Sequence, residues 1–199
     1  DYKLRRLRLG LCHVPHWYWY IVFAWQRGHM SRCQEKKPRE VSASMEPVKL
    51  NIVLVAPEIP QNTGSIGRMC VCLDARLHLI GPLGFKLDEA HRRRAGLDYW
   101  PHLDWRQHGD WDEFVAGEQP RHLFFASTKG TRPYWEFEFA DGDYLVFGNE
   151  SSGLPARLYD EYKDDLYFLP MPGQNARSHN LASTVAVIAY EALRQISSP

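Results

Sequence analysis

The 199-residue chain has few cysteines and no Cys or His pair at metal-ligand spacing. The four cysteines are too few for a disulfide framework in a domain of this size. Cys70 and Cys72 lie two positions apart in a predicted helix, so they cannot share one helical face. We therefore expect reduced thiols in a cytoplasmic protein that holds no metal.

Several common functional motifs are also missing. The first predicted strand is not followed by G-x-G-x-x-G, and G-x-x-x-x-G-K-[ST], G-x-S-x-G and H-E-x-x-H do not occur. Their absence leaves a Rossmann dinucleotide site, a P-loop, a hydrolase nucleophile elbow and a zinc-protease helix unsupported. The apolar stretch "LCHVPHWYWYIVFAW" is too short and too rich in His, Pro and Trp for a membrane span, and we expect no membrane partner.

Charge is balanced overall but unevenly distributed. Residues 1–44 hold nine Lys/Arg and three Asp/Glu, whereas residues 45–199 hold fifteen and twenty-one. This asymmetry indicates a basic segment 1–44 attached to a mildly acidic domain 45–199. Met45 is one candidate for the natural start, which would make residues 1–44 a disordered or non-native extension. The alternative is a basic, aromatic arm that helps to hold RNA or a membrane surface.

From Leu50 onward, short apolar runs alternate with helical patterns. This alternation predicts one α/β domain with a mostly parallel sheet flanked by helices. Strands are predicted at 50–55, 77–80, 122–127, 144–147 and 166–170, and helices at 65–75, 87–95, 110–118 and 180–196. Ligands of such sheets bind beyond the carboxyl ends of the strands. The segments at these ends are rich in glycine, proline and small polar residues, which allow a ligand to approach the backbone closely.

Three of these segments resemble the motifs of a known superfamily. They are "PEIPQNTGSIGR" (57–68), "FGNESSGLP" (147–155) and "LPMPGQNARSHNLA" (169–182), and they resemble the three motifs of the SPOUT methyltransferases. The likeness is strongest to the SpoU-type YibK/TrmL branch, which methylates the wobble-nucleotide ribose of tRNA. "RRAGLDYW" (93–100) and "STKGT" (127–131) resemble further signatures of that family. The resemblance runs from Leu50 to Ile196.

The resemblance implies a fold and a cofactor that periodicity cannot show. It implies a C-terminal trefoil knot, S-adenosylmethionine as the methyl donor, tRNA as the substrate and a homodimer with Tyr190 at its interface. Carried over residue by residue, it places the cofactor against Ala126, Gly148, Leu169 and Ser178, with Met171 and Asn180 as neighbours. Leu169 and Met171 would supply apolar walls for adenine.

The same motifs suggest catalytic residues. Arg68 is expected to position the ribose or phosphate and to stabilise developing alkoxide charge, because an ordinary arginine does not lose its proton. Asn62 is either a catalytic neighbour of Arg68 or a helix cap. Glu150 is expected to organise the cofactor loops, paired with Arg68. Alternatively, it caps the helix that starts near Leu154.

RNA binding needs basic groups on an acidic domain. The best candidates are Lys129 and the run Arg92, Arg93 and Arg94, which alone would be an ordinary solvated face. Tyr99 and Trp100 would either stack on an unpaired base or pack in the core.

The third motif departs from the family pattern at two positions. His179 replaces an apolar residue and Ala182 replaces a hydroxyl. Two alternatives to a wobble ribose methyltransferase therefore remain open. One is a non-catalytic knotted RNA-binding or assembly protein, and the other is a ribose methyltransferase that acts on ribosomal RNA.

Overall fold

The structure is a computed structural model that describes residues 48–86 and 99–197. The chain divides into two compact units, Asp1–Ala43 and Ser44–Pro199, and every described residue belongs to the second. The segment expected at 1–44, the helix expected at 87–95 and the arginine run 92–94 all lie outside the described residues.

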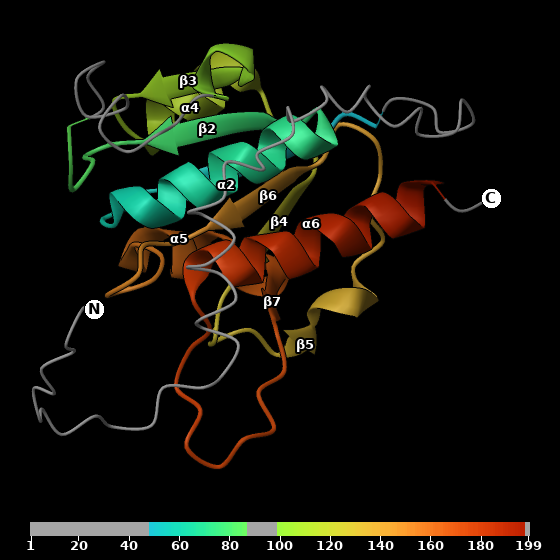
Figure 1. Cartoon of the computed structure of the whole chain (residues 1–199). Coiled ribbons are helices and arrows are strands. Elements are labelled where there is room, and N and C mark those ends of the chain that lie inside the picture. Colours follow the sequence, from blue (N-terminus) through green and yellow to red (C-terminus); the bar gives the residue numbers. More distant parts are fainter. Residues whose placement is uncertain (1–47, 87–98, 198–199) are drawn as a thin grey trace, which may run out of the picture. The chain divides into compact units, whose positions relative to one another are not determined.

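One parallel sheet forms the centre of the second unit (Figure 1). Within the described residues it has seven strands in the order β3-β2-β1-β6-β4-β7-β5, and every pairing is parallel. The strands are β1 (Asn51–Val55), β2 (Arg76–Ile80), β3 (Trp105–His108), β4 (Leu123–Ala126), β5 (Arg132–Pro133), β6 (Tyr144–Phe147) and β7 (Leu166–Phe168). The predicted α/β architecture is confirmed, and each of the five predicted strands is present.

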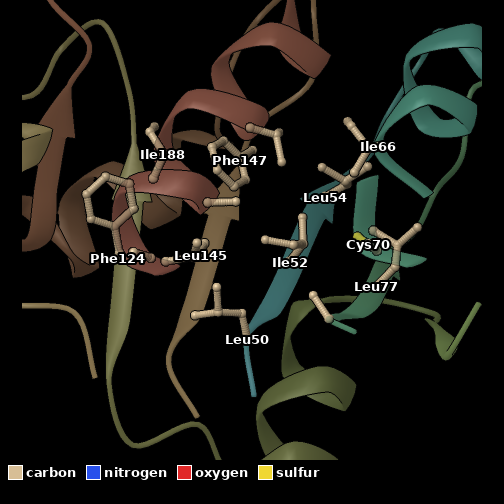
Figure 2. Packing of buried hydrophobic residues seen from close by; sticks show 14 of the residues in the cluster. Leu50, Ile52, Leu54, Ile66, Cys70, Leu77, Phe124, Leu145, Phe147 and Ile188 are labelled. Carbon is tan, nitrogen blue, oxygen red and sulfur yellow. The ribbon is translucent and has the colours of Figure 1, made fainter. Parts of the chain in front are cut away.

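Helices cover both faces of this sheet. Alternate residues of a strand point to opposite faces. Ile52 and Leu54 pack with residues of α2 (Pro60–Leu73) and α6 (Leu181–Ser197), as Figure 2 shows from close by. Val53 and Val55 pack with residues of α4 (Trp111–Glu118) and α5 (Ala156–Glu161). Both faces of β1 are therefore buried, which is why its sequence is a continuous apolar run.

Helix α2 begins five residues earlier than the sequence predicts. Pro60 stands at its first position, where the missing N–H would have no helical partner. The C-cap is Asp74, whose N–H donates to the carbonyl of Cys70, and its left-handed backbone (φ 54°) turns the chain so that Ala75 N donates to the same carbonyl at 2.9 Å. As expected, the two thiols face different ways, with Cys70 buried and Cys72 exposed. Burial raises the pKa of the Cys70 thiol to about 12.

Two strands were not predicted, and both lie at the edges of the sheet. The strand β3 reads "WRQH" and β5 contains only Arg132 and Pro133. Edge strands face solvent and therefore lack the apolar runs that reveal interior strands. Three short 3₁₀ turns complete the described elements: η1 (Trp100–His102), η2 (Tyr134–Glu136) and η3 (Lys163–Asp165). None of the described helices is long and apolar enough to cross a membrane.

Candidate functional site

A cavity of about 550 Å³ lies where β4, β6 and β7 end. All six residues predicted to bind a cofactor line it, together with Asn62, Glu150 and Lys129. Those six are Ala126, Gly148, Leu169, Met171, Ser178 and Asn180. The fold thus brings three motifs that are separated within residues 57–182 to one cavity, as expected for the carboxyl edge of a parallel sheet.

Glu150 contacts the beginning of α2. One carboxylate oxygen accepts a hydrogen bond from Glu58 N (2.9 Å), and the other accepts from Ile59 N (3.3 Å) and from Asn62 Nδ2 (2.8 Å). Ile59 is the N-cap residue of α2 and has no side-chain cap of its own. Glu150 therefore supplies from another loop both the acceptors and the negative charge that favour a helix N-terminus.

This arrangement corrects the expectation that Glu150 caps the helix after Leu154. That helix, α5, begins after Pro155, and its first turn has no side-chain cap hydrogen bond. The carboxylate between two glycines thus stabilises a helix start that is about ninety residues away in sequence and adjacent in space.

A hydrogen-bond chain continues from Glu150 to α6. Asn62 is buried, and its Oδ1 accepts a hydrogen bond from Asn180 Nδ2 at 2.9 Å. Asn180 Oδ1 in turn accepts from Ser183 N at 3.2 Å, in the first turn of α6. Asn62 lies inside α2, so it is not the helix cap that one interpretation expected. Glu150, Asn62 and Asn180 together join the loop after β6 to the starts of two helices.

Arg68 is not part of this hydrogen-bond chain. Its guanidinium lies over the Tyr99 ring, 4.8 Å from the centroid, and it is not among the residues that line the cavity. Between the described residues there is no ion pair joining Arg68 to Glu150, so that expected pairing is wrong. The reason is geometric: Arg68 follows Asn62 by six helical residues, or roughly 9 Å along the axis of α2.

Gly148 is required by the loop itself. A Cβ at this position would lie 2.1 Å from the carbonyl carbon of Gly153, because the loop folds back on the end of β6. Asn149 and Gly153 form a bridge of two backbone hydrogen bonds, and Asn149 Oδ1 accepts from Ser152 N at 2.7 Å. The space beside Gly148 is therefore taken by its own chain, although Gly148 also lines the cavity.

The remaining predicted residues fall in several places. Lys129 lines the cavity, and its Nζ lies 3.9 Å from the centroid of the Tyr159 ring. Trp100 is buried in the core beside Trp105, so base stacking is wrong for this residue. The Tyr99 hydroxyl donates to the carbonyl of Gly64. Tyr190, on α6, is 51% exposed.

The structure also brings together residues that the sequence analysis missed at the cavity. Tyr159, Arg177 and His179 line it, and none belongs to the predicted set. Arg177 and His179 lie within the third motif, and this position could have predicted that they line the cavity. Tyr159 lies on α5, outside the quoted motifs, and nothing in the sequence marks it.

A second cluster away from the cavity was missed as well. His78 on β2, His108 on β3 and Glu118 on α4 hold their potential metal-ligand atoms within 4.8 Å of one another. His78 Nδ1 lies 3.1 Å from His108 Nε2, while the ring centroids are 5.3 Å apart at an interplanar angle of 23°. The two nitrogens therefore point at each other nearly in line, as in an N–H···N hydrogen bond.

The tautomers of this pair follow from its neighbours. Asn51 Nδ2 donates to the carbonyl of Gly142, which turns Asn51 Oδ1 toward His78 Nε2 at 3.4 Å. His78 Nε2 is therefore the protonated nitrogen, and His78 Nδ1 accepts from His108 Nε2–H. Glu118 Oε1 accepts from Arg106 at 2.7 Å. We assign the cluster to the cohesion of β2, β3 and α4 at this edge of the sheet.

Comparison with known proteins identifies the family. A model described as the SpoU rRNA Methylase family matches residues 49–190. A tRNA (cytidine(34)-2'-O)-methyltransferase from Burkholderia cenocepacia (strain HI2424) is 50% identical over 148 residues, which are 73% of this chain and 94% of the relative. The protein of the same name from Escherichia coli (strain K12) is 45% identical over 154 residues, 75% of this chain and 96% of the relative.

Solved structures agree with this assignment. One structure, described as giving insights into the 2-OH methylation of C/U34 on tRNA, has a TM-score of 0.69 at 45% identity and covers 75% of this chain and 97% of its own. The SpoU methyltransferase AviRb from Streptomyces viridochromogenes, in complex with the cofactor AdoMet, has a TM-score of 0.65 at 25% identity and covers 75% of this chain and 58% of its own. With its motifs gathered at one cavity and the family model matching most of its length, the chain belongs to the SpoU rRNA Methylase family.

Proposed function

We propose that this protein is an S-adenosylmethionine-dependent methyltransferase that methylates the ribose 2′-hydroxyl of the wobble cytidine or uridine in tRNA anticodons. The observation that carries the proposal is the single cavity at the strand ends, lined by residues of all three motifs. The relatives at 45–50% identity, which are named for this reaction, support the same substrate class.

The residues of the cavity fit the proposed cofactor. Its volume of about 550 Å³ lies in the usual range for small-molecule sites. Leu169, Met171 and Phe147 offer apolar walls for a purine, and backbone groups around Gly148 and Ser178 can bond its edge. S-adenosylmethionine supplies a methyl group activated by its sulfonium. The AdoMet complex of AviRb, a member of the same structural class, supports this choice.

The chain's own residues have two kinds of role in this proposal. The hydrogen bonds that join Glu150, Asn62 and Asn180 fix the loop after β6 against α2 and α6. They thereby hold the walls of the cavity in place. Arg68 lies outside the cavity wall, and we assign it to gripping the ribose or phosphate of the RNA and stabilising charge on the attacking oxygen. A guanidinium stays protonated in proteins, so Arg68 positions the hydroxyl and does not deprotonate it.

A trefoil knot accounts for an unusual strand order. The strand β7 follows β4 and β5 in the chain and yet lies between them in the sheet. The connection from β4 to β5 passes so close to β7 that a Cβ on Gly130 would lie 2.6 Å from the carbonyl carbon of Tyr167. We propose that the segment from β7 to α6 threads this connection.

A homodimer and a cytoplasmic location complete the proposal. Val187 and Tyr190, three residues apart on α6, are 43% and 51% exposed. Large apolar side chains on a helix face that is open to solvent suit a contact with a second copy of the chain. A tRNA-modifying enzyme is expected where mature tRNA is found, in the cytoplasm.

The test is mass spectrometry of nucleosides from cells with and without the gene. We expect 2′-O-methylated cytidine or uridine to disappear from the wobble position of tRNA in cells without the gene, and to return when the gene is restored. Loss of a ribose methyl group from ribosomal RNA would show instead that the substrate is ribosomal RNA. No change in either RNA would favour a non-catalytic RNA-binding or assembly protein.

A further inference from the structure

Tyr159 connects two walls of the cavity. Its hydroxyl lies 3.3 Å from Leu154 N, in the loop after β6, and 3.3 Å from Ser127 Oγ, in the loop after β4. The Leu154 amide can only donate, so the Tyr159 oxygen accepts there. One hydroxyl of a half-buried tyrosine on α5 thus joins the loop that contains Gly148 to the loop that follows Ala126.

The loop after β6 leaves room for this hydroxyl. Gly153 has a left-handed backbone (φ 75°), and a Cβ there would lie 2.8 Å from the Tyr159 oxygen. A glycine is therefore needed both for the turn and for the approach of the tyrosine. Gly153, the second glycine of "GNESSGLP", therefore makes room for the Tyr159 hydroxyl.

The face of the same ring holds a cation. Lys129 Nζ lies 3.9 Å from the ring centroid, within the range of a cation–π contact. Lys129 N also donates to Ser127 Oγ at 3.1 Å, the same hydroxyl that contacts Tyr159. The backbone and the side chain of Lys129 are therefore both fixed through the Ser127–Tyr159 pair.

We propose that Tyr159 is a positioning residue of the cavity, which fixes the loops after β4 and β6 to each other and holds the Lys129 ammonium for an anionic oxygen of a ligand. Lys129 is exposed and lines the cavity, so its ammonium is accessible to a ligand there. The inference rests on the proposed function, which supplies two sources of such an oxygen: the carboxylate of the methionine moiety and a phosphate of the RNA.

The experiment compares Tyr159→Phe, Tyr159→Leu and Lys129→Met with the double variant Tyr159→Leu/Lys129→Met. The phenylalanine variant loses the hydroxyl and keeps the ring, whereas the leucine variant loses both. Tyr162→Phe, which likewise removes only a hydroxyl, at a tyrosine that packs on Trp111 and does not line the cavity, is the matched control. For each we would measure the Kd of S-adenosylmethionine by calorimetry, kcat and KM for an anticodon stem-loop, and thermal unfolding.

We expect Tyr159→Phe to raise the Kd of S-adenosylmethionine about three- to tenfold, as for loss of one hydrogen bond, with Tyr162→Phe unchanged. If Lys129 binds the carboxylate, Lys129→Met and Tyr159→Leu raise this Kd further. If it binds phosphate, both variants raise KM for the stem-loop and flatten its salt dependence, while Lys129→Met leaves the Kd of S-adenosylmethionine unchanged and Tyr159→Leu raises it only as far as Tyr159→Phe does. In either case Lys129→Met adds little in the Tyr159→Leu background.

Wild-type cofactor binding in Tyr159→Phe and Tyr159→Leu would overturn this inference but not the proposed function. A full effect of Lys129→Met in the Tyr159→Leu background would show that Tyr159 does not hold the lysine. If Tyr159→Leu unfolds, the comparison of Tyr159→Phe with Lys129→Met still decides, because the first variant loses only a hydroxyl and the second changes only an exposed side chain. A wild-type protein that binds no S-adenosylmethionine would overturn the proposed function and the inference with it.

Discussion

Glu150 and His78 show how single side chains can serve sequence-distant elements. Glu150 follows a buried strand and accepts three hydrogen bonds at the start of α2, two from the backbone N–H groups that precede the helix and one from Asn62 in its first turn. His78 is fully buried on β2 and accepts a hydrogen bond from His108 on β3. In both cases the partner is set by strand order in the sheet, and not by local sequence.

Replacing Glu150 by glutamine should destabilise the protein and weaken cofactor binding. The glutamine amide would place an N–H where a carboxylate oxygen now accepts, opposite the Glu58 or Asn62 donor. We expect a loss of about 1–3 kcal/mol in the free energy of unfolding, measured by urea denaturation. Glu161→Gln, an exposed change on α5, is the control. Equal stability of the two variants would contradict the assigned role of Glu150.

The His78–His108 pair makes stability depend on pH. Burial lowers the pKa of His78 from 6.5 to about 4, against an opposing effect of Glu118, and the nearby His108 lowers this pKa by a smaller amount. The unfolded chain therefore binds a proton that the folded chain refuses, and stability falls as pH falls from 6.5 to about 4. The loss is roughly 3 kcal/mol at most. His78→Gln should flatten that part of the unfolding profile, and an unchanged slope would contradict the assignment.

At the scale of elements, the strands that are buried on both faces could be predicted from the sequence, and the solvent-facing edge strands could not. The interior strands β1, β2, β4, β6 and β7 were predicted because both faces are covered and their residues are apolar. The edge strands β3 and β5 have no such signal. The residues chosen by motif resemblance line one cavity, but resemblance could not supply distances, so Arg68 was paired with a carboxylate that instead contacts the start of α2.

Gly148→Ala tests the loop after β6 as a unit. The added Cβ would collide with the backbone of Gly153, which cannot move without breaking the Asn149–Gly153 bridge. We expect loss of detectable S-adenosylmethionine binding in calorimetry and a lower melting temperature. Gly117→Ala is the matched control, since a Cβ there meets nothing within 4 Å and alanine favours its helix. Normal cofactor affinity in Gly148→Ala would show that the loop tolerates displacement.

At the scale of the whole molecule, α6 has a buried side and an exposed side. Its buried side, with Val185, Ile188 and Ala192, packs into the core, and its N-terminus at Asn180 borders the cavity. Its other side exposes Val187 and Tyr190. A contact between two copies at this face would link the assembly of the dimer to the helix that completes the site.

Tyr190→Asp should convert the proposed dimer into monomers. A charge at a buried apolar contact has no partner and costs several kcal/mol of association energy. We expect light scattering on a sizing column to show half the wild-type mass, with a native circular-dichroism spectrum. Lys163→Asp, a comparable change on η3, should leave the mass unchanged. A Tyr190→Asp variant that keeps the wild-type mass would place the interface elsewhere.

The central claim is tested most directly by methyl transfer to a synthetic tRNA anticodon stem-loop. Purified protein and S-adenosylmethionine are incubated with the loop and with a matched loop that carries a 2′-deoxy wobble nucleotide. We predict one methyl group on the wobble ribose of the first loop and none on the second, with Arg68→Ala slower by a factor on the order of 10². Methylation of the deoxy loop would contradict the account. So would a failure to methylate both the loop with the wobble 2′-hydroxyl and full-length tRNA.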